Sequence, residues 1–214
     1  MTSLRATTAR HALLVAALLA AACSKPAPPA ANQVAPAPAP VAEGPPPSAD
    51  NALAGVPDVT REYYDVTGNS LFEIRRALNQ VRPRDPNDGL GVDALSNWYF
   101  EWRWPGAANG GCDLANAGLS FRARIRMPRL VATADTPPAV RQRWQAYVTA
   151  LEAHEANHIR HAWDNRTLVL TAIQRSTCDN ANRDAEAAIA QLVQGDVAYD
   201  QRTRHGMLEG AHFP

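Results

Sequence analysis

The sequence predicts an α+β domain over residues 56–214, in which a small antiparallel sheet packs against a long helix. Two runs, at 98–104 and 119–127, alternate large apolar and polar side chains, which is the period of half-buried strands. A later stretch, from Thr136 to about Gln174, repeats apolar residues at helical spacing. These periods predict the two layers of the domain.

The first expected elements are a strand over 61–66 and a helix over 71–81. Residues 61–66 are rich in strand formers and are followed by the turn signal Gly68-Asn69. Ser70 and Glu73 have the spacing of a capping box. The helix is then expected from the apolar residues Leu71, Ile74, Leu78 and Val81.

The two alternating runs are interpreted as sheet strands with one face in the core. In the first run the inward residues are Trp98, Phe100, Trp102 and Trp104. We interpret this aromatic row as core, with the lining of a substrate groove as the alternative. In the second run Arg122, Arg124 and Arg126 form a basic stripe, interpreted as a solvated face rather than a docking surface for acidic groups. Pro128 is expected to close that strand.

The long helix is expected to begin at the cap pair Thr136-Pro137 and to run to about Gln174. This length is unusual in a globular domain, so a kink or break is expected within it. A second, shorter helix over 184–193 is expected to end at Gly195.

A zinc-hydrolase signature lies on the long helix. His154 and His158 are four residues apart, so both imidazoles lean over one face and can bind one metal ion. Catalytic zinc keeps one coordination position open for water, whose pKa the metal lowers to about 7. Glu155 is placed to take the proton of that water as general base. The apolar stripe of the helix continues onto both histidines, so the metal face points toward the sheet.

The third protein ligand is open to several residues. His205 is the favoured candidate, because it lies in a C-terminal segment dense in polar side chains. Glu186 and His161 are the alternatives, although His161 lies about 10.5 Å along the helix axis from His154. Asp200 or Thr203 could orient an imidazole. Tyr199 is a candidate for stabilising the oxyanion.

The N-terminus has the layout of an export signal. Residues 1–22 combine a basic start with an apolar run too short to span a bilayer. Cys23 follows this run and resembles the lipidated cysteine of bacterial lipoproteins, with ordinary cleavage and secretion as the alternative. Residues 23–55 are then the lipidated Cys and an Ala/Pro-rich tether. By the same resemblance, Ser24 favours the outer membrane, facing the periplasm.

The two remaining cysteines, Cys112 and Cys178, are an even pair in an oxidising compartment, so a disulfide is predicted. Zinc ligation by these thiolates is the weaker alternative, because no Cys-x-x-Cys pair is present. The formal net charge is zero, and nothing argues for a nucleic-acid partner.

From about Tyr63 to Pro214 the chain resembles a family of bacterial predicted secreted zinc-dependent proteases, catalogued mostly as a domain of unknown function. The resemblance includes the Trp-rich strand, both cysteines, Trp144 and the His-Glu-x-x-His core. It also includes the ending Tyr199-Asp200-x-x-Thr203-x-His205-Gly206. It implies metal ligation by His154 and His158, catalysis by Glu155 and a role for His205. Asn157 departs from the family, which usually has Gly there.

The sequence therefore predicts an extracytoplasmic zinc metallohydrolase, most readily a peptidase acting on a peptide or protein, with the membrane contacted through the lipid. The alternatives are a non-catalytic envelope lipoprotein with a structural zinc or binding role, and a hydrolase of a non-peptide amide such as cell-wall material.

Overall fold

The computed structural model describes residues 52–108 and 110–214. The expected signal, the lipidation at Cys23 and the tether up to residue 51 lie outside the described residues. The last residues assigned to the tether, 52–55, form a turn in which Leu53 is buried. Arg160 Nε donates to the Ala52 carbonyl over 2.8 Å, so this turn packs on the domain. None of the helices in the described ranges is both long and apolar enough for a membrane span.

Three strands form a mixed sheet, β1 (Val59–Val66), β2 (Leu95–Arg103) and β3 (Gly118–Leu130), in the order β1-β3-β2. The α+β class is confirmed. The antiparallel prediction holds for β2 and β3 but not for β1, which runs parallel to β3. A helix and a loop separate β1 from β2 in the chain. In the sheet, β3 lies between these two strands and pairs with both.

Pro128 does not close β3, which continues for two more residues to Leu130. Ala123 and Val131 donate their backbone N–H groups toward the β1 side, so the nitrogen of Pro128, an odd number of residues from each, faces the β2 side. There β2 pairs only as far as Leu95 with Arg126. The missing N–H of Pro128 therefore costs the sheet no hydrogen bond.

The first helix, α2 (Leu71–Val81), has the predicted bounds. Ser70 caps it, since its Oγ accepts from the Glu73 N–H at 3.2 Å. The predicted long helix breaks at Asn165 into α3 (Pro138–Asp164) and α4 (Arg166–Gln174). Two short 3-10 turns, η1 (Leu114–Asn116) and η2 (Met207–Glu209), complete the helical elements described.

The last helix, α5 (Ala181–Thr203), corrects the prediction of a short helix ended by Gly195. Gly195 lies inside α5 and faces the His161 ring, whose Nε2 would be 2.9 Å from a Cβ at that position. The glycine thus allows close helix packing rather than ending the helix.

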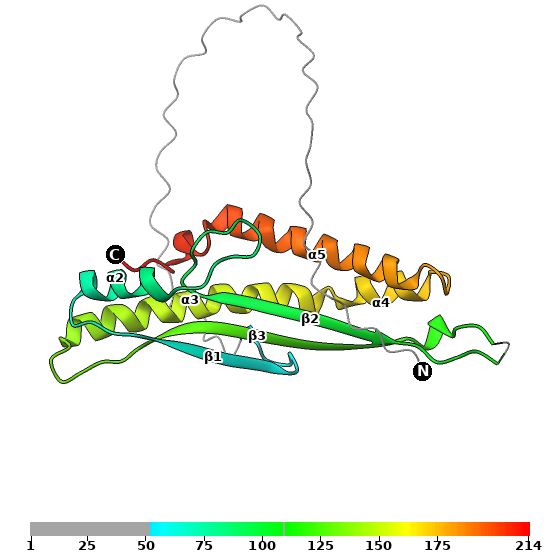
Figure 1. The fold of residues 1–214 in the computed structure, drawn as a ribbon, viewed down its shortest axis with the longest axis horizontal. Coiled ribbons are helices and arrows are strands. Elements are labelled where there is room, and N and C mark those ends of the chain that lie inside the picture. Colours follow the sequence, from blue (N-terminus) through cyan, green and yellow to red (C-terminus); the bar gives the residue numbers. More distant parts are fainter. Residues whose placement is uncertain (1–51, 109) are drawn as a thin grey trace, which may run out of the picture. The chain divides into compact units, whose positions relative to one another are not determined.

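Helix α3 lies between the sheet and α5 in Figure 1. The aromatic row of β2 joins the core, as interpreted from the sequence: the Phe100 ring packs tilted against Phe121 at 5.2 Å, and Phe121 in turn lies 5.4 Å from Trp163 of α3. On the other face Arg122 pairs with Glu101 and Arg124 with Glu62, all well exposed. The basic stripe is therefore a solvated, ion-paired face.

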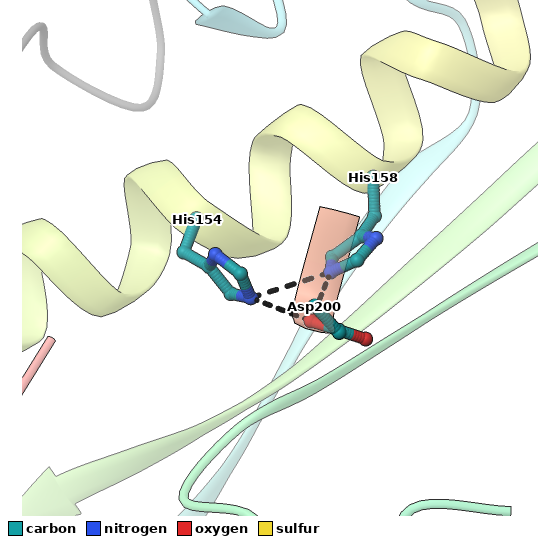
Figure 2. A group of neighbouring side chains, drawn as sticks. All are labelled: His154, His158 and Asp200. Atoms are coloured by element: carbon teal, nitrogen blue, oxygen red, sulfur yellow. Dashed lines mark hydrogen bonds and ion pairs between the residues drawn. The ribbon is translucent and has the colours of Figure 1, made fainter. Parts of the chain in front are cut away.

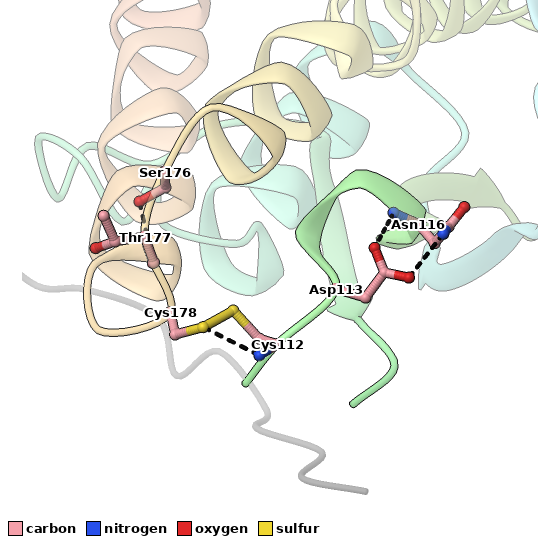
Figure 3. Close-up of a disulfide and its surroundings, with 6 residues drawn as sticks. All are labelled: Cys112, Asp113, Asn116, Ser176, Thr177 and Cys178. Carbon is pink, nitrogen blue, oxygen red and sulfur yellow. Dashed lines mark hydrogen bonds between the residues drawn. A yellow bond between two sulfur atoms is a disulfide. The ribbon is translucent and has the colours of Figure 1, made fainter. Parts of the chain in front are cut away.

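The predicted disulfide between Cys112 and Cys178 is present (Figure 3). Their Cα atoms are 5.7 Å apart, and 66 positions separate them in the sequence. The bridge joins the segment before η1 to the turn between α4 and α5. It therefore ties the sheet end of the domain to the start of the helix that carries Asp200.

Candidate metal centre

The site lies where α3 and α5 run side by side in opposite directions. His154 and His158, one turn apart on α3, face Asp200 and Asp196, one turn apart on α5. Figure 2 shows both imidazoles pointing from α3 toward the Asp200 carboxylate. Both histidines are buried, as the sequence predicts, but their imidazoles contact carboxylates of α5 and of the turn after it rather than the sheet.

Three donor atoms meet at this point. Asp200 Oδ1 is 3.0 Å from His154 Nε2 and 3.1 Å from His158 Nε2, and the two nitrogens are 3.3 Å apart. Bonds of about 2.0–2.2 Å in a tetrahedral shell separate neighbouring ligand atoms by roughly 3.3–3.6 Å. The three atoms are therefore spaced like one face of a metal coordination shell, and these residues are the candidate metal-binding group.

Each imidazole is held from behind by a second carboxylate. His154 Nδ1 lies 2.8 Å from Glu209 Oε2, and His158 Nδ1 lies 3.3 Å from Asp196 Oδ1. An ionised carboxylate only accepts hydrogen bonds, so both contacts place a proton on Nδ1. Each Nε2 is thereby the nitrogen offered to a cation, as in many protein metal sites.

The charges of the site reinforce each other without a metal. Burial alone lowers the pKa of His158, but hydrogen bonds to Asp196 and Asp200 raise it to about 10. Burial likewise opposes ionisation of Asp200, yet the hydrogen bonds from His154 and His158 hold its pKa well below the usual range. The same field that stabilises protons on the imidazoles favours a divalent cation.

Glu155 is buried beside the cluster and lines the cleft onto which the cluster opens. Burial raises the pKa of its carboxyl group, and the charges of His158 and His154 offset part of that rise. The Ser96 hydroxyl on β2 donates a hydrogen bond to it. This is the place that the sequence assigns to a general base.

The cleft has a volume of about 250 Å³. Its walls come from the segment between α2 and β2, the start of β2, the metal face of α3 and the C-terminal residues. Near the mouth, Leu90 and Met207 are 59% and 50% exposed, which gives the opening an apolar rim. A chain segment of a substrate could reach the cluster along this path.

His205, the favoured third ligand, lies next to the cluster rather than within it. Its Nδ1 is 3.6 Å from Asp200 Oδ1, and the ring also faces Asp85 and Asp88, with which it forms a separate group. Arg204 and His205 both have left-handed backbone conformations, with φ of 52° and 51°. The direct ligation by His205 stays a prediction, and Asp200 is the residue that the structure brings to both imidazoles.

The two alternative ligands lie elsewhere. Glu186 is exposed on α5 and precedes Asp200 by fourteen residues, about 21 Å along a helix axis. His161 turns its Nδ1 toward Asp196 at 2.9 Å. Neither belongs to the group around His154 and His158. Thr203 orients no imidazole, since its hydroxyl bonds to the Tyr199 carbonyl and accepts from the Gly206 N–H.

Tyr199 packs against both imidazoles, stacked on His154 at 4.9 Å and edge-on to His158 at 5.0 Å. Its hydroxyl donates to Glu209 at 2.8 Å and accepts from Asn157 Nδ2 at the same distance. The residues that line the cleft do not include it. The structure gives Tyr199 a positioning contact, and its predicted oxyanion role stays a prediction. Asn157, the departure from the family pattern, serves this contact.

Sequence reasoning missed Asp196 and Glu209, and it assigned Asp200 only an orienting role. Asp196 and Asp200 repeat the four-residue spacing of the two histidines, which is a readable signal on a helix. The expected helix end at Gly195 hid it. Glu209 carries no such signal, because its place depends on the turn after α5.

Residues 61–206 match the family model described as a bacterial protein of unknown function, DUF922. The chain belongs to this family. The DUF922 match contains the whole group His154, His158 and Asp200, whereas Glu209 lies beyond it. No curated protein and no solved structure matches the chain. Membership in DUF922 assigns no activity to the chain, so a protease activity is a proposal.

Proposed function

We propose that the protein is a metal-dependent hydrolase, most readily a zinc peptidase. The observation that carries this proposal is the meeting of two imidazole nitrogens and one carboxylate oxygen within 3.0–3.3 Å of one another, at a cleft lined by buried Glu155. A cluster that only stabilised the fold would not need a further carboxyl group such as that of Glu155 beside it in the cleft.

His154, His158 and Asp200 would hold the ion through Nε2, Nε2 and Oδ1. Three protein ligands are the usual number in catalytic zinc sites, where the fourth position takes water or substrate. A bound zinc ion supplies Lewis acidity and lowers the pKa of water. Two histidines and one carboxylate also suit ferrous iron, so the adjacent Glu155 is what favours hydrolysis.

Glu155 moves the proton. Its carboxylate accepts a proton from the attacking water and delivers it to the leaving amine, so one group acts first as base and then as acid. The hydrogen bond from Ser96 favours the ionised form of that carboxylate. The burial of Glu155 keeps bulk water from competing for the proton.

A peptide substrate is supported by the sheet edge at the cleft. Leu95 and Ser96 line the cleft, and their strand β2 is an outer strand of the sheet. An outer strand offers free backbone groups to an extended peptide, which adds to the sheet as a further strand. This favours a peptide over a non-peptide amide as substrate class.

Export and lipid anchoring through Cys23 belong to the same proposal. The disulfide supports it, because such bonds persist in oxidising compartments outside the cytoplasm. Labelling with a fatty-acid analogue tests it, and a Cys23→Ala variant should take up no label.

The test of the activity combines metal analysis with Glu155→Gln. We expect one zinc per purified chain, and hydrolysis of a peptide library that falls at least about a hundredfold in the variant. Retention of stoichiometric zinc by the variant shows that only the chemistry was lost. No hydrolysis by wild type would favour the non-catalytic lipoprotein, whereas undiminished hydrolysis by Glu155→Gln would refute the proposed role of Glu155.

A further inference from the structure

The Asp196 carboxylate on α5 is the meeting point of three side chains. Trp98 Nε1 of β2 donates to Oδ2 over 2.7 Å. His161 Nδ1 of α3 lies 2.9 Å from Oδ1, the same oxygen that faces His158 Nδ1 at 3.3 Å. Two donors outside the metal cluster therefore fix the plane of the carboxylate that orients His158.

The His161 ring reaches Asp196 only because residue 195 is glycine. A Cβ at that position would lie 2.9 Å from His161 Nε2 and closer still to Cε1. Real side chains do not approach so closely, so any other residue would displace the ring or the helix. Glycine inside a helix costs about 1 kcal/mol relative to alanine. Its presence in the middle of α5 is explained by the space that the ring needs.

We propose that His161 is a positioning residue of the metal centre, acting through Asp196, and that Gly195 provides its space. This inference rests on the proposed metal site, and it gives His161 a role other than that of a ligand. Groups that orient a metal-binding histidine from behind typically contribute 10- to 100-fold to metal affinity. His161 and Trp98 act one step further out, by holding the carboxylate that does this.

The experiment compares two replacements of His161 that separate hydrogen bonding from side-chain volume. His161→Asn keeps an N–H donor near the place of Nδ1, whereas His161→Leu keeps only volume. The full chain, freed of metal, is titrated with Co²⁺ against a chelator, and the visible spectrum of the complex is recorded. We expect His161→Leu to bind Co²⁺ about tenfold or more weakly with an altered spectrum, and His161→Asn to stay within about threefold of wild type.

Gly195→Ala supplies the second arm. Alone it should weaken Co²⁺ binding as His161→Leu does, because it displaces the ring. Combined as His161→Asn/Gly195→Ala it should recover, since asparagine lacks the two ring atoms that the new Cβ would meet. Glu186→Gln, an exposed change on the same helix, is the control and should match wild type.

Wild-type affinity and spectrum in His161→Leu, or in Gly195→Ala, would overturn the proposal. Equal losses in His161→Leu and His161→Asn would also do so, because they would point to packing rather than hydrogen bonding. If wild type itself bound no Co²⁺, the metal centre would fail instead. The positioning role would then be judged by crystal structures of the metal-free variants, where unchanged His158 and Asp196 rotamers in His161→Leu refute it.

Discussion

Metal binding by this site should release protons and strengthen steeply as the pH rises. The pKa of His158 is raised to about 10 by its hydrogen bonds to Asp196 and Asp200, which outweigh the effect of burial. A metal ion requires the neutral imidazole, so at pH 7 it must first displace that proton. His154, whose pKa is also raised, adds to the effect.

The size of the effect follows from the distance between pH and pKa. At pH 7 a group with a pKa of about 10 is protonated by roughly a thousand to one, which weakens apparent metal affinity by about 4 kcal/mol. While His158 remains protonated, each pH unit should strengthen binding about tenfold, and more where His154 also releases a proton. The slope should level off above pH 10.

Calorimetric titration with Zn²⁺ in buffers of different ionisation enthalpy measures the protons released. Between pH 6.5 and 8.5 we expect between one and two protons per ion bound. Asp196→Asn removes the negative charge from one of the two hydrogen-bond acceptors that raise the pKa of His158, so this variant should release fewer protons at the same pH. A constant affinity across this range, with no proton release in wild type, would refute the electrostatic reasoning.

The same shift predicts the stability of the metal-free protein. The pKa of His158 is higher in the folded state than its ordinary 6.5, so its contribution is complete below pH 6.5 and is lost as pH rises toward 10. Urea unfolding of the apoprotein should therefore show a falling free energy of unfolding over that window. The free energy of unfolding of Asp200→Asn should fall less over this window, because the variant lacks the anion that stabilises both imidazolium groups.

Three further outcomes are expected. Asp200→Asn should weaken Co²⁺ binding more than His205→Asn does, because Asp200 Oδ1 lies within 3.1 Å of both imidazole nitrogens, whereas His205 belongs to a separate group. The reverse order would restore His205 as third ligand. Reduction of Cys112–Cys178 should lower the free energy of unfolding by about 4 kcal/mol, which follows from the chain-entropy relation for a 66-residue separation. Metal affinity measured below the new melting temperature should stay unchanged. Phe213→Ala should cost about 3–5 kcal/mol in chemical unfolding, since its side chain is fully buried against Trp144 and Tyr147.

Features set by local signals could be predicted from the sequence. Ser70 and Glu73 define the start of α2 because a cap is made within one turn of backbone. His154 and His158 share a face because helix geometry alone puts them there. The cysteine pair needed only the inference of an oxidising compartment.

Features that depend on a distant partner could not be predicted in this way. The direction of β1 relative to its neighbour depends on which strand takes the central position. Pro128 is tolerated only because β2 does not extend beside it. A glycine such as Gly195 is typical of a helix end, but here it provides space for the His161 ring within the helix. Only the position of His161 distinguishes the two roles. In each case the local sequence predicts one structural role, and the neighbouring element determines another.

The candidate metal-binding group is the clearest case, because it depends on the register between two helices. In the observed register His154 contacts Asp200 and His158 contacts Asp196, as two antiparallel helices allow when both pairs are one turn apart. A shift of α5 by one residue would turn its side chains by about 100° and move both carboxylates off the cluster. The His161 ring seated against Gly195 fixes this register one turn away. The contact that explains why a glycine lies in the middle of α5 therefore also explains why an aspartate, rather than the histidine after the helix, meets the two imidazoles.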